Sequence, residues 1–433
     1  MNGSALYLES LRREVVLAQG CTEPAAAALC SAAAAELLGE PALRVTLAVS
    51  PYVYKNGMNV GIPGVPNATG LAIAAALGCV IADPAQGLAV MQNLRSEQID
   101  RARRMTDDGR VHITMLSSAE KVYFEAACQS ERHTARCVIA RFHNQIQLKE
   151  LDGEVLFQMA EDRQDGLTDA GRASLAAPPE SMTVRGILDF CRMEPFESFH
   201  MLREVVAVNL CIAREGLRGE WGLRVGKTLE TNRRTGFLRS DAAQEAIALT
   251  AAAADARMAG CDLPVMSTAG SGNQGLTASL PIMVAAKHAS VSEETMLRAL
   301  AMSLLITIHT KTYLGRLSAL CGCGVSAAIG VCAGLVFMMD GDDEAVLAAM
   351  RSMAADITGM FCDGAKPGCA LKIATSVHAA YQAAALALAG VGAGARDGIV
   401  RMDIEQTLAG IGRLGGEAMT GVNDAILSLL REA

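Results

Sequence analysis

Four short stretches that follow one another decide the fold: VHITML (residues 111–116), VYFEAACQ (122–129), TARCVIARF (134–142) and QIQLKEL (145–151). Each is rich in β-branched or aromatic residues or alternates apolar with polar positions, which is typical of short strands. The polar residues 130–132 predict a turn between the second and third stretches. The chain therefore predicts a small sheet of consecutive strands.

The residues that flank this sheet predict the elements that complete a small α/β domain. Apolar and polar residues alternate from about 43 to 54, which predicts one more strand. Residues 56–70 are rich in Gly, Pro and Asn and predict a loop, and helices are expected at 70–82 and 84–106. We expect this domain to cover residues 41–165, with a mixed or antiparallel sheet.

The rest of the chain predicts helices. Residues 1–40 contain two helices broken near Gly20, and we expect them to pack on a large helical domain. The polar residues 160–180 predict a linker. After this linker the apolar spacing is helical, most clearly in the alanine-rich residues 242–259. The predicted fold class is α+β, with a small α/β domain followed by a mainly helical domain over residues 180–433.

Two long uncharged runs, between Arg316 and Asp340 and between Lys372 and Arg396, are long enough to be compared with membrane spans. The first contains four glycines, three cysteines and two serines, and the second contains a serine, a histidine and a glutamine. These polar and small residues favour buried core helices, so we expect no membrane partner.

Composition indicates a soluble globular protein. The 433 residues are enough for two or three domains. Charged residues make up 19%, below the usual quarter, and this sparse charged surface leads us to expect a homo-oligomer, a dimer in the simplest case. The net charge of −8 excludes the basic footprint of a nucleic-acid-binding protein and suits a cytoplasmic one. The first 17 residues lack the apolar core of a signal peptide.

The 13 cysteines are scattered singly, which excludes a disulfide scaffold and indicates a reducing compartment. Three of them stand in glycine-rich settings: Cys321 in LCGCG, and Cys362 and Cys369 at the two ends of CDGAKPGC. Three thiolates are one short of a closed tetrahedral set, so a metal or iron–sulfur centre held by them keeps a position open for a substrate. Their spacing matches no general metal motif, and Cys323 is an alternative to Cys321.

Cys21 stands in QGCTEP, directly before a predicted helix. Thr22 is a good N-cap and Pro24 suits the first helical turn. The N–H groups and dipole of a helix N-terminus favour a thiolate, so we expect the pKa of Cys21 to be lowered. The alternative is a buried cysteine beside an ordinary cap.

Two pairs of polar residues are candidates for binding a carboxylate. Lys55 and Asn56 open a glycine-rich loop directly after a predicted strand. Lys311 and Arg316 lead into Cys321, where either cation can offset the charge of a cluster or hold a carboxylate. An ordinary turn and an ordinary helix end are the alternatives.

The stretch STAGSGNQG (267–275) is a third candidate. It contains Ser267, Asn273 and Gln274 among glycines that leave backbone N–H groups open to an anion. The lysine of a nucleotide-binding P-loop is missing, so a carboxylate suits it better than a nucleoside triphosphate. A simple loop is the alternative.

Together these motifs resemble the L-cysteine desulfidase family, which is related to the α-chain of iron–sulfur L-serine dehydratases. The matching segments run in consistent order over nearly the whole chain: GCTEP (20–24), KNGMNVGIPG (55–64), STAGSGNQG (267–275), residues 311–323 and residues 362–372.

The resemblance implies a lyase that needs no pyridoxal phosphate and converts L-cysteine and water to pyruvate, ammonia and sulfide on a 4Fe–4S cluster. It implies Cys321, Cys362 and Cys369 as the cluster ligands, with one iron left free. Cys321 is preferred to Cys323 because it stands four residues before Val325, as the first ligand does in the dehydratases. On this model Cys21 is the base that removes the Cα proton. The candidates for holding the substrate carboxylate and ammonium are Lys55, Asn56, Ser267, Asn273, Gln274, Lys311 and Arg316.

Three alternatives remain at this point. The same cluster can serve a lyase for L-serine or another β-substituted amino acid. It can also serve a protein that senses cysteine or redox state without turnover. In the third alternative the cluster is lost and the cysteines are core residues.

Overall fold

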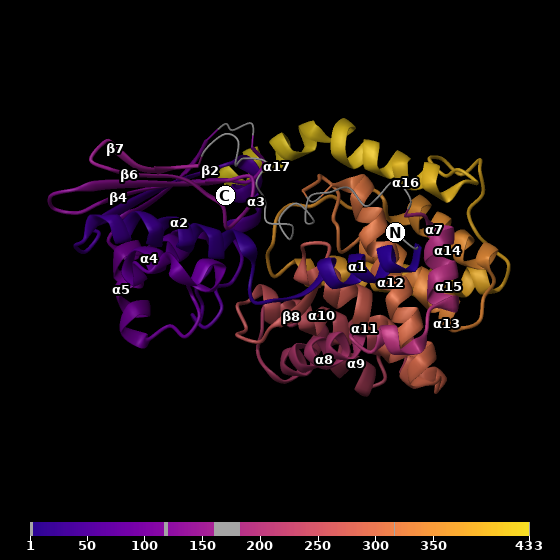
Figure 1. The fold of residues 1–433 in the computed structure, drawn as a ribbon. Coiled ribbons are helices and arrows are strands. Elements are labelled where there is room, and N and C mark those ends of the chain that lie inside the picture. Colours follow the sequence, from indigo (N-terminus) through magenta and orange to yellow (C-terminus); the bar gives the residue numbers. More distant parts are fainter. Residues whose placement is uncertain (1–2, 117–119, 160–181, 316, 433) are drawn as a thin grey trace.

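The computed structural model describes residues 3–116, 120–159, 182–315 and 317–432. A six-stranded sheet with its covering helices forms one side of the molecule, and a larger helical region forms the other (Figure 1). This arrangement confirms the predicted α+β class. The predicted linker at 160–180 lies outside the described residues, and the exact domain boundaries stay a prediction.

The sheet is mixed. Strand β2 (Arg44–Val49) is parallel to β3 (Val111–Met115) and antiparallel to β4 (Tyr123–Gln129). The remaining strands add antiparallel neighbours, in the order β3-β2-β4-β5-β6-β7, and they are β5 (Thr134–Ala140), β6 (Ile146–Leu151) and β7 (Glu154–Gln158). The predicted strands and the turn at 130–132 are confirmed, whereas β7 was not predicted.

The alternation in β2 explains which face of the sheet is covered. Val45, Leu47 and Val49 are fully buried, while the side chains between them lie on the other face. The strand ends at Val49 rather than at residue 54, because Pro51 begins a short helix, α3 (Pro51–Gly57). The predicted loop therefore begins after this helix.

Two helices lie against the buried face, α2 (Thr22–Leu38) and α4 (Leu71–Ile81), and α5 (Ser96–Asp107) packs on α4. Small residues let α2 and α4 approach closely, since a Cβ on Gly78 would lie 2.2 Å from the carbonyl oxygen of Ala28. The predicted helix at 84–106 is divided, because a short 3-10 segment, η1 (Pro84–Ala89), precedes α5.

The first forty residues do not pack as one unit. Helix α1 (Gly3–Glu14) contributes Leu6 and Leu11 to the core of the helical region. Helix α2 instead belongs to the core of the sheet region, because its alanine-rich surface lies against β4 and β5. Between them, β1 (Val15–Ala18) pairs antiparallel with β8 (Val265–Thr268), a two-stranded ribbon that was not predicted.

Besides α1, the helical region contains eleven further helices and two shorter helical segments among the described residues. These are α7 (Val184–Met193), η3 (Phe196–Phe199), α8 (Leu202–Arg218), α9 (Val225–Arg234), α10 (Ala242–Met258), α11 (Gly272–Ala289), α12 (Glu293–Leu314), α13 (Ser326–Met338), α14 (Asp343–Ile357), α15 (Cys369–Leu388), α16 (Ile404–Arg413), η4 (Leu414–Ala418) and α17 (Thr420–Glu432).

The two long uncharged runs contain α13 and most of α15, and α13 is buried along almost its whole length. It packs tightly on α12, where a Cβ on Gly330 would lie 2.3 Å from the carbonyl oxygen of Ser303. Within the described part of the chain, no helix is both long and apolar enough to cross a membrane.

The two regions touch closely where α10 ends. The N–H of Gly61 donates to the carbonyl of Met258 over 2.8 Å, and a Cβ on Gly61 would lie 2.3 Å from the carbonyl carbon of Ala259. Helix α17 lies beside α3 and contacts it (Figure 1). The segments around these two contacts between the regions contain most of the candidate site residues that the sequence predicts.

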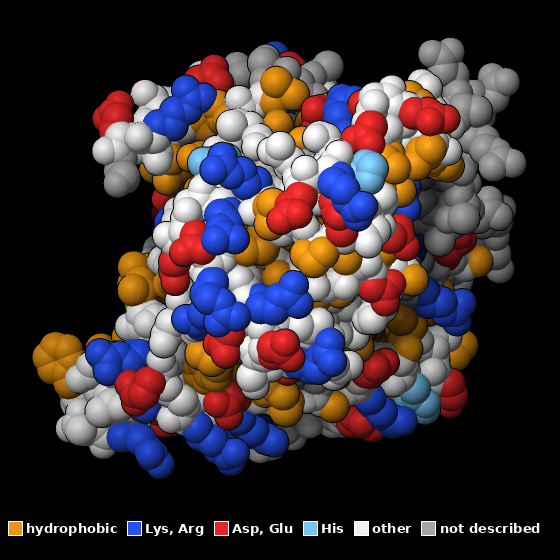
Figure 2. Space-filling model, turned by 90° about the vertical axis from the view of Figure 1, so that its left-hand side faces the viewer, with side chains coloured by type: hydrophobic (Ala, Val, Ile, Leu, Met, Phe, Trp, Pro, Cys, Tyr) orange, Lys and Arg blue, Asp and Glu red, His pale blue; other side chains and the backbone are white. Residues whose placement is uncertain are grey.

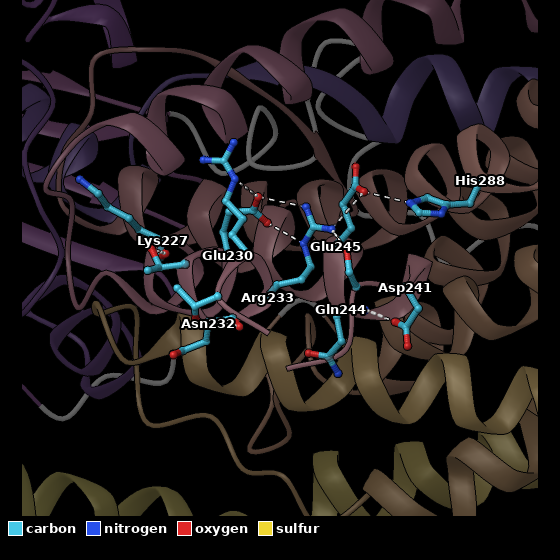
Figure 3. A network of polar contacts seen from close by, with 12 residues as sticks. Lys227, Glu230, Asn232, Arg233, Asp241, Gln244, Glu245 and His288 are labelled. Carbon is cyan, nitrogen blue, oxygen red and sulfur yellow. Dashed lines mark hydrogen bonds and ion pairs between the residues drawn. The ribbon is translucent and has the colours of Figure 1, made fainter. Parts of the chain in front are cut away.

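The surface carries charges of both signs. On the face in Figure 2, basic and acidic side chains are intermixed and apolar side chains are scattered among them. A network on the helical region joins α9, α10 and α11 (Figure 3). In it, Glu245 accepts from Lys287 Nζ and from His288 Nε2, each over 2.9 Å, and Arg233 Nε donates to Glu230 over 2.8 Å. These pairs are ordinary surface interactions that fasten neighbouring helices together.

Candidate active site

Two of the three predicted cysteine ligands lie on paired segments. The chain after α12 and the chain after α14 meet in a short antiparallel bridge between Leu320 and Phe361. The N–H of Cys321 donates to the carbonyl of Met360 over 2.9 Å, and the N–H of Cys362 donates to the carbonyl of Ala319 over 2.6 Å. The backbone therefore holds Cys321 and Cys362 on two paired segments, one residue beyond the bridge on each, although 41 positions separate them in the sequence.

Cys369, the third predicted ligand, is the first residue of α15 and faces back into its own loop. Its Sγ lies 3.7 Å from the carbonyl oxygen of Gly364. Gly364 has a φ of +95°, and a Cβ there would lie 2.0 Å from the carbonyl oxygen of Lys55. The loop therefore needs glycine at this position in order to lie against α3.

The three thiols influence one another electrostatically. The pKa of Cys369 is raised to about 11, mainly by burial and also by the nearby Cys321 and Cys362, while Lys366 opposes the rise. Cys321 and Cys369 are buried and Cys362 is half-buried. The structure thus brings together the three cysteines that the sequence proposed as a ligand set.

Cys323 is the direct neighbour of this set. Its Sγ lies 3.4 Å from the Sγ of Cys321. The hydrogen bond between the two lowers the pKa of Cys321 to about 6, against the cost of burial, and Lys372 and Lys311 add to the lowering. The same hydrogen bond, together with burial, raises the pKa of Cys323. The pair therefore favours a thiolate on Cys321 and a thiol on Cys323, in line with the preference for Cys321 as the ligand.

The glycines on both sides of Cys323 leave room for other side chains to approach Cys321 and Cys323 closely. A Cβ on Gly322 would lie 2.6 Å from Gln274 Oε1 and 3.4 Å from Lys311 Nζ. A Cβ on Gly324 would lie 2.4 Å from the sulfur of Met360. Both glycines are needed for close packing, which explains the LCGCG sequence.

Cys21 is the residue before α2 and is buried in a small cluster with Val60, Met258 and Cys369. The expectation of a lowered pKa is wrong in direction. Burial raises the pKa of Cys21, and the nearby Arg257 offsets this only in part. The cost of removing a thiolate from water outweighs the helix N-terminus and the guanidinium.

Lys55 and Asn56 make different contacts. Lys55 is only 3% exposed, and its Nζ donates to the carbonyl of Cys362 over 3.0 Å and to Asn423 Oδ1 over 2.7 Å. Burial lowers the pKa of this lysine. Asn56 Nδ2 donates to Glu23 Oε1 over 3.1 Å, so it fastens α3 to the first turn of α2 beside Cys21.

The stretch from Ser267 to Gly275 forms the end of β8 and the start of α11. Ser267 Oγ donates to the carbonyl of Val16 over 2.8 Å, so its hydroxyl is used in the β1–β8 ribbon. Asn273 Oδ1 accepts from Arg257 Nη1 over 3.1 Å. Gln274 Nε2 donates to the carbonyls of Thr268 and Ala269 over 3.1 and 3.2 Å. Gln274 Oε1 is buried and has no hydrogen-bond partner among the described residues.

The two cations before Cys321 can be placed only in part. Lys311 lies in the last turn of α12, is buried, and its charge acts on Cys321. Arg316 lies outside the described residues, so its predicted role is untested.

Three residues that local sequence reasoning missed also belong here. Lys372 donates to the carbonyl of Phe361 over 2.8 Å and pairs with Asp363. Asn423 brings the C-terminal helix α17 onto Lys55. Arg257 lies at the end of α10, and a signal for it was present, because it is one of few charges in the alanine-rich residues 242–259. Nothing local in the sequence pointed to Asn423.

Two cavities lie elsewhere among the described residues. They have volumes of about 560 and 550 Å³ and are lined by residues of α14, α16, η4 and the segment around Gly398. None of the cysteines described above lines either of them. The convergence of thiols, buried cations and an unpaired amide oxygen is therefore the better candidate site.

Comparisons with known proteins agree with this placement. A family model described as serine dehydratase alpha chain matches residues 85–428, a range that includes all three predicted ligands. The chain therefore has the domain of a serine dehydratase alpha chain.

Curated relatives match over nearly their full length. A UPF0597 protein from Oleidesulfovibrio alaskensis is 42% identical over 98% of this chain and 97% of its own. UPF0597 proteins from Clostridioides difficile (strain 630) and Clostridium perfringens (strain ATCC 13124) are 39% and 36% identical, over 98% and 99% of this chain and 99% and 98% of theirs. The protein belongs to the UPF0597 family. The predicted relation to serine dehydratase α-chains is thereby confirmed, whereas the desulfidase assignment stays a prediction.

Proposed function

We propose that this protein is a lyase that needs no pyridoxal phosphate and cleaves L-cysteine to pyruvate, ammonia and sulfide at an iron–sulfur cluster. The observation that carries this proposal is that Cys321, Cys362 and Cys369 lie near one another at a largely buried place, with lysine ammonium groups close to the thiols. The serine dehydratase alpha chain domain supports a lyase, because its name describes an elimination from a β-substituted amino acid.

The donor set fits an iron–sulfur cluster better than a single ion. Among the described residues, no three Cys, His, Asp or Glu side chains lie close enough together to hold one metal ion. A cluster is larger than an ion and takes its ligands from thiolates. Cys321, Cys362 and Cys369 would hold it. When bound, a cluster with one iron free of protein ligands supplies a Lewis acid for the leaving sulfur.

The lysine side chains of the site would compensate the negative charge of the cysteine thiolates and of a bound cluster. Lys372 and Lys311 favour the thiolate of Cys321, and Lys55 fixes the carbonyl of Cys362. Burial of these groups strengthens their effect, because charge–charge interactions grow as water is excluded. The chain thus supplies compensation for an anionic centre before any substrate arrives.

Cys21 would take the Cα proton on its Sγ. It lies in one buried cluster with Cys369, next to the predicted ligand set. Its raised pKa makes the thiolate a strong base once formed, and Arg257 favours that form. Asn56, Asn273, Gln274, Lys311 and Arg316 remain the candidates for orienting the substrate, while the hydroxyl of Ser267 is already used within the fold.

A second candidate function is the dehydration of L-serine at the same site. The name of the matching family model favours it directly. A hydroxide leaves much less readily than a sulfide, so a serine enzyme needs a group that protonates the leaving oxygen. The buried thiols around the site suit the soft sulfur of cysteine better. For both functions we expect a cytoplasmic homodimer that binds an amino acid and neither nucleic acid nor membrane.

The test compares the two substrates on anaerobically purified protein. Iron and acid-labile sulfide are counted, and pyruvate is measured with L-cysteine and with L-serine. We expect a cluster in each chain and a higher kcat/KM for L-cysteine. A clear preference for serine would replace the first proposal by the second, and spectral changes without pyruvate would indicate a sensor. Cys332→Ala, a buried cysteine in α13, is the matched control and should keep both iron and activity.

A further inference from the structure

Arg257 is a buried cation without a carboxylate. It is 8% exposed, and its guanidinium donates to Asn273 Oδ1 over 3.1 Å and to the carbonyl of Gly20 over 2.8 Å. Its Nε is buried and has no hydrogen-bond partner in the described part of the chain. No Asp or Glu of the described residues forms an ion pair with it. Guanidinium is always charged in proteins, and a buried charge is costly unless an anion accompanies it.

The guanidinium lies at a helix N-terminus, where a second source of positive potential is present. Helix α11 has 18 residues, and its N-cap residue Ser271 makes no side-chain capping bond. The first N–H groups of such a helix have no partner within the helix and attract anions. A Cβ on Gly272 would lie 2.3 Å from Arg257 Nε, so the guanidinium packs directly on the first turn. The two positive features therefore act on the same point.

This point adjoins the proposed catalytic groups. The charge of Arg257 acts on the thiol of Cys21, and Met258, the next residue, packs in one cluster with Cys21 and Cys369. Gly20, whose carbonyl accepts from Arg257, directly precedes Cys21. An anion held by Arg257 would thus have its neighbouring atoms close to both Cys21 and the ligand set.

We propose that Arg257 and the first turn of α11 form a carboxylate site that takes the α-carboxylate of the substrate amino acid. This proposal rests on the proposed lyase function and adds to it the group that recognises the substrate class. A guanidinium matches a carboxylate with two parallel N–H donors, whereas a lysine offers only a point charge. Bound in this way, the substrate has its Cα next to the carboxylate and therefore near Cys21. Lys311 and Lys55 are then left for the anionic thiolates.

The test uses an unreactive amino acid and its neutral counterpart. L-Alanine and L-alaninamide have nearly the same shape, but only the first carries a carboxylate. Calorimetric titration of the anaerobic holoprotein should show that the wild type binds L-alanine more tightly. Arg257→Gln should abolish this preference, with a loss of roughly 10- to 100-fold in L-alanine affinity, the range of a charge-assisted hydrogen bond. Arg257→Lys should recover only part of it.

Iron content and steady-state kinetics complete the design. Both variants should keep the iron of the wild type, and their defect with L-cysteine should fall mainly on KM. The proposal is overturned if the wild type binds L-alanine and L-alaninamide equally well, or if Arg257→Gln still prefers L-alanine. It is also overturned if both variants lose the same affinity for both ligands, which is the result of a purely structural role. A defect in kcat with unchanged KM overturns it as well, because Arg257 would then act on Cys21 rather than on the carboxylate.

The failure of the proposed function would look different. If the wild type makes no pyruvate from cysteine or serine but still prefers L-alanine through Arg257, the carboxylate site stands and the lyase does not. If the wild type is an active lyase and Arg257→Gln keeps its KM, the lyase stands and the carboxylate site does not.

Discussion

The protein buries two groups of neighbouring cysteines, and they differ in what surrounds them. Between the sheet and its helices, Cys79 and Cys128 lie 3.5 Å apart, and Cys30 Sγ lies 3.3 Å from the carbonyl oxygen of Cys137. In the helical region, Cys321 and Cys323 lie 3.4 Å apart, within reach of the charges of Lys311 and Lys372. The distances are alike, but among the described residues the charges that act most on Cys30 and Cys128 are those of other thiols, whereas lysines act on Cys321.

The effect of this difference is visible in the acidities. Burial raises the pKa of Cys30 well above its usual value, and the hydrogen bond with Cys79, followed by burial, does the same for Cys128. The pKa of Cys321 instead falls to about 6. A buried pair of thiols is therefore an ordinary core feature, and nearby cations with glycine-rich backbone distinguish the pair that belongs to the proposed cluster site.

The largest expected effect is the loss of the cluster. Cys369→Ala removes one of three proposed ligands, so we expect the iron content and the lyase activity to fall close to zero. Cys137→Ala, in the sheet group, should leave both unchanged. The measurement is iron and acid-labile sulfide per chain after anaerobic purification. Equal iron loss in both variants would remove the distinction between the two groups.

Charge compensation should have the next largest effect. Lys372→Met removes a cation that acts on Cys321 and pairs with Asp363. We expect the affinity for the cluster or the activity to fall by roughly 10- to 100-fold, as for other groups that support metal ligands. The rate of iron loss to a chelator measures this. An unchanged rate would mean that backbone geometry alone holds the thiols.

The cysteines between the sheet and its helices should make the stability of the protein depend on pH. Because the folded pKa values of Cys30 and Cys128 are raised, both thiols contribute stability that is present below their unfolded pKa and is lost as pH rises. The loss is up to about 1.4 kcal/mol per pH unit for each thiol above an unfolded pKa of about 8.5. Denaturant unfolding of cluster-free protein at several pH values should therefore give a flatter curve for the Cys30→Ala, Cys128→Ala double variant. Parallel curves would contradict the raised values.

The sequence predicts the fold well wherever local pattern decides it. Strict alternation in β2 and the runs at 111–151 give the sheet, because burial on one face imposes a period of two. The β1–β8 ribbon was missed because its four-residue strands pair positions about 250 residues apart, and no local signal encodes that contact. Strand β7 was missed although the turn before it has a clear cause, since Asp152 and Gly153 both have positive φ.

For the candidate site, too, the sequence predicts what local pattern decides and misses what depends on distant contacts. Glycine-rich settings point to Cys321, Cys362 and Cys369 from the sequence alone, and the structure places them together. The acidity of Cys21 was mispredicted because the helix N-terminus is visible in the sequence, whereas the burial that opposes it is not. Arg257 was missed for a related reason, because its burial depends on the packing of α10 against distant segments.

The smallest effect should come from a cation far from both groups. Lys287 donates to Glu245 on the surface, and its own side chain is 72% exposed. Lys287→Ala should change the free energy of unfolding by no more than about 0.5 kcal/mol, because exposed pairs are weakened by solvent and salt. His288 also bonds Glu245 and would retain part of the interaction. Iron content and activity should not change, and this separates the effect of a cation beside buried thiols from that of any lysine. If Lys287→Ala lowered iron content as Lys372→Met is expected to do, the importance assigned to the cations of the site would be misplaced.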